Sequence, residues 1–270
     1  MSQISPQRFR RLIWNWYKHH RRNLPWRKTR DPYRILVSEV MLQQTQVSRV
    51  LEKYPQFLKK FPNGESLARA RLADVIRAWS GLGYNRRAIF LYRAAKEIVE
   101  KFDGVFPRDV STLQKLPGLG PTTAAAIAAF SFDADAPVID TNVRRVLTAF
   151  FSEILCRLET LAQKLVPKGK NRDWTYALFD FGAMALRRNG GLTCPLHADC
   201  RWLEKMRELV ARGARRARRG KSGRGVRFEE TNRYFRGRIV EMARTGSVPI
   251  AKLKRTLRLS KDRFEKIIQS

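Results

Sequence analysis

The stretch LQKLPGLGPTTAAAIAAF, residues 113–130, places two glycines between two segments of helical periodicity. Gly118 and Gly120 flank Leu119, and Pro121 stands where a helix accepts proline at its first position. Glycines permit a sharp turn and let backbone N–H groups approach a phosphate oxygen with no Cβ in the way. The positive end of the following helix dipole adds to this attraction. The stretch therefore predicts a turn that grips a nucleic-acid backbone without reading its sequence, with an ordinary helix–helix turn as the alternative.

The charge of the whole chain points to the same partner. Its 270 residues contain 55 Lys and Arg against 24 Asp and Glu, a formal net charge of +31. This excess is more than solubility requires, and a polyphosphate backbone is the partner that uses such a field most directly. A basic protein that contacts RNA or anionic lipid without specificity is the alternative that charge alone leaves open.

Helical periodicity dominates the chain outward from this stretch, and no convincing strand appears. Short turns rich in glycine and proline separate the helical segments, so the sequence predicts a compact all-α body. We expect helices over residues 9–22, 33–43, 50–61, 67–79, 86–102, 121–130, 143–150 and 174–186.

The composition changes after residue 200. We assign residues 1–202 to the helical body, and 203–226, which include ARGARRARRGKSGRG, to a basic linker. Residues 227–270 predict a small basic appendage of three helices, the last two in a helix-turn-helix-like pattern. A winged-helix-like unit is one interpretation of this appendage. A plain packing unit accounts for that pattern equally well.

Two further features concern location. Cysteines stand at positions 156, 194 and 200 only, which is no disulfide framework and suggests a reducing compartment. No apolar run approaches the ~20 residues of a membrane span. We expect a monomer without a membrane partner, cytoplasmic and nucleoid-associated if the source is prokaryotic.

Six motifs then occur in the order and spacing of one enzyme family. They are LPWR (24–27), DPYRILVSEVMLQQTQV (31–47), WSGLGYNRRA (79–88), LPGLGPTTAAAI (116–127), VIDTNVRRVL (138–147) and DFGAMA (180–185). From residue 8 to about 200 the chain resembles the A/G-specific adenine DNA glycosylases of the helix-hairpin-helix, endonuclease III-like superfamily. SEVMLQQTQV separates it from endonuclease III and the thymine-mismatch glycosylases, which share the hairpin and the aspartate.

The resemblance implies a fold and an activity. The fold is two all-α lobes with double-stranded DNA and an extruded base in the cleft between them, because the glycosidic bond is unreachable inside a duplex. The activity is a monofunctional glycosylase that removes adenine mispaired with guanine or 8-oxoguanine in base excision repair.

Two carboxylates suit the chemistry of cleaving an N-glycosidic bond. Glu39 lies in a mostly apolar helical segment, where partial burial raises the pKa of a carboxyl group and lets it protonate a purine nitrogen. Asp140 ends an apolar run and is the candidate for the ionised partner of the sugar cation, acting electrostatically or covalently. The alternatives are a structural ion pair for Glu39 and a helix N-cap for Asp140.

The resemblance assigns roles to two neighbouring residues. Asn142 matches an asparagine that helps to organise the nucleophilic water and the sugar side of the site. Thr122 stands where related bifunctional lyases carry a Schiff-base lysine, so we expect no efficient β-lyase activity. Adenine glycosylases commonly have tyrosine or serine there, and threonine is a departure that keeps the hydroxyl.

Matching motif positions also gives the expected DNA contacts. Leu24, Trp26 and Arg27 are expected around the extruded adenine, with Asp180 as a further candidate. A second set is expected to enter the duplex near the lesion or to hold its backbone: Gln44, Thr45, Leu82, Tyr84, Gly118, Leu119, Gly120 and Thr123. Core packing is the alternative for Leu24, Trp26 and Leu82.

Most members of the family hold a four-iron four-sulfur cluster with four cysteines. Here Cys194 and Cys200 of CPLHADC look like remnants of that site, whereas Leu186 and the RNGGL segment occupy the region of the first two. Two thiolates cannot complete the cage, so we predict no iron–sulfur cluster and no other cofactor. Zinc bound by Cys194, His197 and Cys200 is an open alternative with unusual spacing.

Two rival functions remain at this point. A thymine- or uracil-mismatch glycosylase would share the hairpin and Asp140, and a catalytically inactive duplex DNA-binding protein would share the charge. The segment after Cys200 is shorter than the usual domain that recognises 8-oxoguanine, so that domain is expected to be absent and the opposite-base preference is left open.

Overall fold

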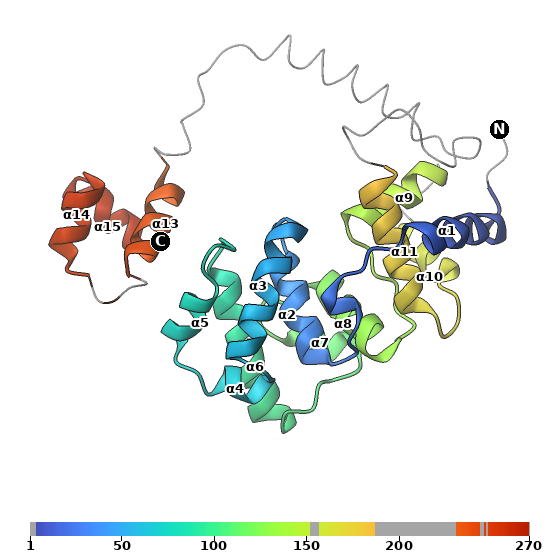
Figure 1. The fold of residues 1–270 in the computed structure, drawn as a ribbon, viewed down its shortest axis with the longest axis horizontal. Helices are drawn as coiled ribbons and strands as arrows, with labels where there is room; N and C mark the ends of the chain where they lie inside the picture. The colour runs from blue at the N-terminus through green and yellow to red at the C-terminus, as the bar shows by residue number, and fades with distance from the viewer. Residues whose placement is uncertain (1–3, 152–156, 187–230, 244–245, 247, 270) are drawn as a thin grey trace, which may run out of the picture.

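The computed structural model describes residues 4–151, 157–186, 231–243, 246 and 248–269 (Figure 1). In these residues all regular structure is helical, which confirms the predicted all-α class. The first lobe holds a 3-10 helix, η1 (Pro25–Arg27), and the helices α2 (Pro32–Leu42), α3 (Val47–Lys60), α4 (Gly64–Ala68), α5 (Leu72–Ala78), α6 (Arg86–Phe102), α7 (Val110–Lys115) and α8 (Pro121–Phe132). The second lobe holds α1 (Pro6–His20), α9 (Thr141–Phe150), α10 (Leu158–Leu165) and α11 (Asn171–Met184).

The first lobe is built around α2. Seven of its eleven residues are buried, because α2 packs against α3, α6 and α8 together. Helix α8 contributes mainly alanines, whose small side chains allow its backbone to approach α2 and α7 closely. Because α2 is packed against three other helices, it holds its only acidic residue, Glu39, at a fixed position in the lobe.

The second lobe joins the two ends of the glycosylase-like region. Helix α1 packs against α11, and its Phe9 ring lies 5.1 Å from the rings of Phe150 and Phe151 and 6.0 Å from that of Trp174. Residues 11–20, RLIWNWYKHH, therefore belong to a helix whose apolar side is packed against the rest of the second lobe. Figure 1 shows α1, α9, α10 and α11 together on one side and α2 to α8 on the other.

Beyond shifts of a few residues at several helix ends, the helices differ from the expected ones around α4 and α5 and at α10. The helix expected over residues 67–79 is two helices, α4 and α5, because the backbone of Arg71 is extended and restarts the chain in a new direction. Asn63 caps α4 with a capping box, which moves its start back to Gly64. Helix α10 was not expected at all.

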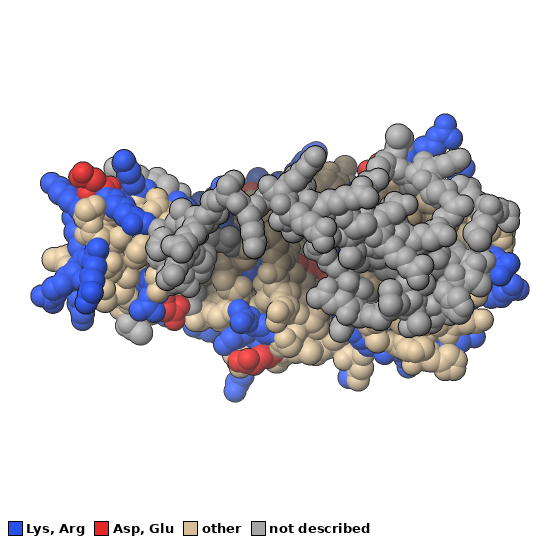
Figure 2. All heavy atoms as spheres, turned by 90° about the horizontal axis from the view of Figure 1, so that it is seen from above, with Lys and Arg blue, Asp and Glu red and all other residues tan. Residues whose placement is uncertain are grey.

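The C-terminal unit contains α13 (Asn232–Ala243), α14 (Ile250–Leu257) and α15 (Lys261–Gln269). Helix α13 contacts both of the others, and Leu253, Phe264 and Ile267 are buried between them. Lysine and arginine side chains crowd the end of the molecule that holds this unit, at the left of Figure 2. The linker predicted at 203–226 lies outside the described residues, so the domain boundaries stay a prediction. Within the described ranges no helix combines the length and apolar content needed to cross a membrane.

Candidate active site

A cavity of about 330 Å³ opens where the two lobes meet. Its volume is at the small end of the range for ligand pockets, roughly 300–1,000 Å³. Its walls come from η1, α2 and the start of α8 on one side and from α9 and α11 on the other. The lining residues are Arg22, Leu24, Trp26, Arg27, Glu39, Leu42, Gln43, Thr45, Val47, Thr122, Thr123, Asp140, Asn142, Tyr176 and Phe179.

Glu39 enters this cavity from the first lobe. Helix α2 begins firmly because Pro32 occupies its first turn and the Asp31 side chain accepts the N–H groups of Tyr33 and Arg34. The pKa of Glu39 is raised to about 8, first by burial and then by the nearby Asp140 carboxylate, while the charge of Arg27 opposes both. At neutral pH Glu39 is therefore mostly protonated and able to donate a proton.

Asp140 enters the cavity from the second lobe as the N-cap of α9. One carboxylate oxygen accepts the Val143 N–H at 2.7 Å, and the other accepts the Asn142 side-chain amide at 2.8 Å. The capping role is thus real, and it coexists with a position in the cavity wall. Burial raises the pKa of Asp140, whereas these hydrogen bonds and the charge of Arg145 lower it and favour the ionised form.

Asn142 is fixed between Asp140 and α11. Its amide oxygen accepts a hydrogen bond from Arg145 at 3.3 Å, and the same guanidinium donates to the Gly182 carbonyl at 2.9 Å. A Cβ on Gly182 would lie 2.8 Å from the Asn142 backbone oxygen, so glycine is needed for this close approach of α11 to α9. The direct partner of Asn142 is the Asp140 carboxylate, and its predicted contact with water stays a prediction.

Thr122 and Thr123 lie at the start of α8. The Thr122 hydroxyl donates to the Ile139 carbonyl at 3.3 Å and so touches the chain one residue before Asp140. The Thr123 hydroxyl accepts the Gln43 side-chain amide at 3.3 Å. None of the described residues that line the cavity is a lysine.

Leu24, Trp26 and Arg27 of LPWR form one wall of the cavity, and their predicted contact with an extruded adenine stays a prediction. Leu24 and Trp26 are buried and also line the cavity, so core packing and pocket lining are both satisfied. Trp26 packs edge-on against Tyr54 at 5.5 Å. The Arg27 guanidinium lies over the Tyr176 ring, 4.4 Å from its centre.

Asp180 does not lie where the sequence placed it. Its side chain is fully buried behind the wall, outside the cavity lining, and binds arginines. Arg27 donates to both of its oxygens, at 2.7 and 2.8 Å, and Arg22 donates through its backbone N–H and its guanidinium. Burial alone would raise the pKa of Asp180, but these hydrogen bonds and charges hold it below its ordinary value. Asp180 therefore orients two arginines of the wall and has no free oxygen to offer a base.

The residues expected to enter the duplex divide into two groups. Gln44 and Tyr84 are exposed at the tips of two adjacent loops, both with left-handed backbones, φ 53° and 47°. Thr45 lines the cavity next to them. Leu82 is only 3% exposed and belongs to the core of the first lobe, the alternative that the sequence left open.

The hairpin residues also have different environments. Gly118 has φ 78°, and a Cβ there would meet the Phe90 Cβ at 2.6 Å, so it is required by the fold itself. A Cβ on Gly120 would have nothing within 4 Å, which leaves the backbone at the start of α8 open to a ligand. The Leu119 side chain is buried, so any contact of this residue with DNA has to come from its backbone.

Several residues of the cavity escaped the sequence reasoning, among them Arg22, Gln43, Tyr176 and Phe179. Arg22 stands just before LPWR, and Tyr176 and Phe179 lie four residues and one residue before Asp180 on α11. Their closeness in sequence to recognised motifs could have identified these residues as candidates. It could not have shown which face of α11 is turned to the cavity.

The metal question falls outside the described residues, because Cys194, His197 and Cys200 are not among them. In the part of the chain that the structure describes, no group of three or more His, Cys, Asp or Glu side chains is arranged for a metal ion. The prediction of no iron–sulfur cluster stays a prediction.

Residues 37–175 match the family described as HhH-GPD superfamily base excision DNA repair protein. The chain is also 39% identical over 248 residues to an adenine DNA glycosylase from Mycolicibacterium smegmatis, covering 88% of this chain and 81% of that protein. The chain belongs to the adenine DNA glycosylase family of the HhH-GPD superfamily.

Two further likenesses place the chain in the same superfamily. Another adenine DNA glycosylase, from Buchnera aphidicola subsp. Baizongia pistaciae, is 39% identical over 202 residues, and the chain spans 58% of its length. Among solved structures, a thermostable thymine-DNA glycosylase has a TM-score of 0.69 at 31% identity, covering 74% of this chain and 97% of that one. In this member of the adenine DNA glycosylase family, motifs far apart in sequence meet at one cavity: LPWR, the end of α2, the start of α8 and the Asp140 cap.

Proposed function

We propose that the protein is a monofunctional DNA glycosylase that removes adenine mispaired with guanine or 8-oxoguanine from double-stranded DNA. One observation carries the proposal: Glu39 and Asp140 reach a single cavity from opposite lobes, and burial raises the pKa of Glu39 to about 8. A protonated and an ionised carboxyl group on one small cavity are what cleavage of an N-glycosidic bond requires.

The reaction follows from these two groups. Glu39 donates its proton to a ring nitrogen of the extruded adenine, so the base leaves as a neutral molecule with the electron pair of the glycosidic bond. The sugar becomes an oxocarbenium ion, which the Asp140 carboxylate stabilises while Asn142 holds that carboxylate in place. Water then adds to the sugar carbon, and its proton returns to the Glu39 carboxylate.

The absence of a lysine from the described cavity lining supports a monofunctional enzyme. A β-lyase needs an amine to form a Schiff base with the opened sugar, and Thr122 supplies only a hydroxyl. Incubation with a mismatched duplex tests for lyase activity. Borohydride should trap no covalent enzyme–DNA adduct, and the strand should break only after alkaline treatment of the abasic product.

The net charge and the turn at Gly118 to Gly120 support double-stranded DNA as the partner. The net charge of +31 and the open backbone at Gly120 suit a phosphate backbone, and extrusion brings one base to a cavity of this size. We expect the protein to act on DNA as a monomer.

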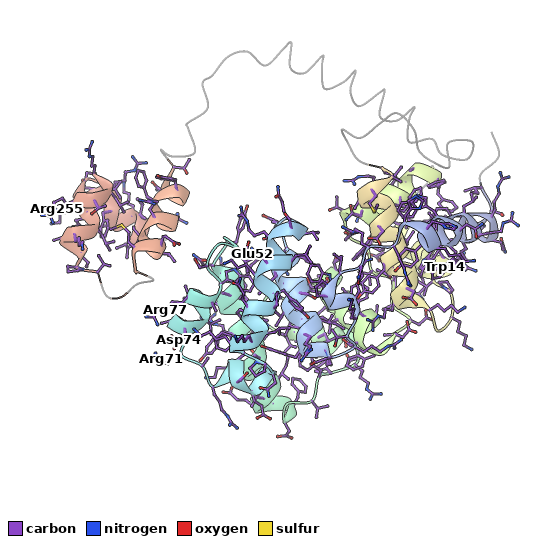
Figure 3. The ribbon with its side chains drawn as sticks, viewed as in Figure 1. Trp14, Glu52, Arg71, Asp74, Arg77 and Arg255 are labelled. Atoms are coloured by element: carbon purple, nitrogen blue, oxygen red, sulfur yellow. The ribbon has the colours of Figure 1, made fainter. Side chains whose placement is uncertain are left out.

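Single-turnover release of adenine from A:G and A:8-oxoguanine duplexes tests the proposal. Glu39→Gln and Asp140→Asn should each lose at least about a hundredfold in rate, since each removes a charge or proton that the reaction uses. Glu97→Gln and Asp74→Asn are the matched controls, because both residues are ion-paired away from the cavity. Asp74 projects from α5 between Arg71 and Arg77 at the outer side of the first lobe (Figure 3).

Full activity of both cavity variants would overturn the mechanism.

A second candidate function, removal of thymine from a T:G mismatch, comes from the likeness to the thermostable thymine-DNA glycosylase, at 31% identity. A T:G duplex in the same assay separates the two: release of thymine without release of adenine would favour that candidate, and tight duplex binding without release of any base would indicate an inactive DNA-binding protein.

A further inference from the structure

Two loops of the first lobe lie side by side next to the cavity. One follows α2 and contains Gln43, Gln44 and Thr45, and the other joins α5 to α6 and contains Leu82 to Tyr84. Each loop has an exposed side chain at a residue with a left-handed backbone, Gln44 in one and Tyr84 in the other. Residues other than glycine adopt this backbone only when the surrounding structure holds them there.

The group that holds both loops is the side chain of Arg87, near the start of α6. It is 8% exposed, and its two terminal nitrogens donate to acceptors in both loops and at the end of α2. These acceptors are the carbonyl oxygens of Val40, Met41, Gln43, Leu82 and Gly83 and the hydroxyl of Thr45, at 2.5 to 3.1 Å.

The acceptors are divided between the two nitrogens. Nη1 binds the carbonyls that end α2 and begin the first loop, whereas Nη2 binds Thr45 and both carbonyls of the second loop. Because the guanidinium is rigid and planar, fixing one side of it fixes the other. Arg87 is therefore a single bridge that sets the distance between the loops.

The same bridge reaches the catalytic helix. The last carbonyls of a helix have no partner within the helix, and Arg87 satisfies two of them one and two residues after Glu39. The loop residues that it binds, Gln43 and Thr45, also line the base cavity. Any displacement of the loop tips is thus transmitted to the end of α2 and to the cavity mouth.

The charge of Arg87 is not explained by an ion pair. Its acceptors among the described residues are carbonyl oxygens and one hydroxyl, no carboxylate influences its pKa, and the rings of Trp79 and Tyr84 lie 5.4 and 5.5 Å away. A buried cation with only dipolar partners is a costly way to stabilise a loop. Its position, beneath the two exposed tips, suits a cation that holds these loops rigid.

We propose that Arg87 is a positioning residue that locks the Gln44 and Tyr84 loops into one rigid wedge, so that insertion into the duplex and extrusion of the base occur together. The proposal rests on the proposed function, because it needs a duplex from which a base is extruded. Arg87 touches no substrate itself; it acts through the two loops and the end of α2.

The test compares Arg87→Lys with the wild type at a temperature where circular dichroism shows both folded. Lysine keeps the charge but cannot span six acceptors. Single-turnover adenine release should fall by about ten- to a hundredfold, as expected for a small misplacement of the reacting groups. The fluorescence gain of 2-aminopurine, an adenine analogue at the target position, should fall in parallel, while binding to matched duplex should stay within about twofold.

Arg10→Gln is the matched control. Its guanidinium also donates to backbone carbonyls, those of Lys164 and Leu165, but in the second lobe and away from the cavity. We expect its rate and fluorescence gain to equal those of the wild type. An equal loss in Arg10→Gln would overturn the proposal, because the effect would then be general destabilisation.

A double-mutant cycle separates positioning from a merely structural role. If Arg87 acts largely through the loop tips, Arg87→Lys should cause a clearly smaller further loss in a Gln44→Ala/Tyr84→Ala background than in the wild type. An undiminished further loss, or an Arg87→Lys enzyme with normal rate and base extrusion, would overturn the proposal. A wild-type protein that extrudes 2-aminopurine but releases no adenine would reject the proposed function. The fluorescence gain of Arg87→Lys, compared with that of the wild type, would then still test the role of Arg87.

Discussion

At the scale of single residues, the activity depends on two carboxyl groups held in different protonation states. Glu39 acts when protonated, and its pKa is raised to about 8, so kcat/KM should fall as pH rises through about 8. Asp140 acts when ionised, and its pKa is also raised, so kcat/KM should fall at acid pH, sooner than for an ordinary aspartate. The expected profile of adenine release against pH is a bell, and Glu39→Gln should abolish its basic limb.

The free energy of unfolding of the wild type and of Glu39→Gln provides an independent check that Glu39 is the group that titrates near pH 8. The folded protein keeps the Glu39 proton up to about pH 8, whereas the unfolded chain loses it near 4.5, so the free energy of unfolding falls as pH rises between these values. Glutamine cannot ionise and escapes this loss. Urea denaturation should therefore show Glu39→Gln gaining roughly 3–5 kcal/mol on the wild type between pH 5 and pH 8, at about 1.4 kcal/mol per pH unit. A variant that loses both activity and stability at pH 8 would mean that Glu39 is a structural residue.

At the scale of elements, the turn between α7 and α8 contains two glycines with different roles: Gly118 is needed for stability, and Gly120 is expected to contact DNA. Gly118→Ala forces a Cβ onto Phe90 at a left-handed backbone and should destabilise the protein by about 2–4 kcal/mol, measured by thermal or urea unfolding. Gly120 has a φ of −75° and open space around the position that a Cβ would take, so Gly120→Ala should leave the stability of the protein unchanged. Its affinity for matched duplex should fall, because the added methyl group keeps the backbone away from a phosphate. Equal affinity of the Gly120→Ala variant and the wild type would contradict a backbone contact at this turn.

The sequence predicted these elements better than their environments. Periodicity and turn residues located most helices of both lobes, because each helix carries its own buried stripe. The break between α4 and α5 was missed, since it depends on the extended backbone of Arg71 and not on a helix-breaking residue. The candidate site was predicted as far as motifs determine it, with Glu39 and Asp140 on one cavity, whereas the burial of Asp180 behind two arginines depends on contacts between residues more than 150 positions apart.

At the scale of the whole molecule, the excess positive charge should act through particular surfaces. The C-terminal unit presents exposed Lys252, Arg255 and Lys266 on α14 and α15, and Arg255 is labelled at the outer edge of this unit in Figure 3. If these side chains contact phosphates, replacing all three by glutamine should weaken binding to matched duplex. It should also reduce the slope of log affinity against log salt by up to about 0.9 per contact.

The control is a change of equal net charge elsewhere. Arg69, Lys96 and Lys101 already pair with Glu65, Glu100 and Glu97, so their replacement by glutamine alters the net charge by the same amount without removing an unpaired cation. If the two triple variants show the same slope, long-range charge alone attracts the DNA and the C-terminal unit makes no contact of its own. If only the first variant changes the slope, and its single-turnover rate at saturating enzyme stays normal, the unit adds affinity without taking part in the chemistry, because rate at saturation depends on the cavity and affinity on the phosphate contacts.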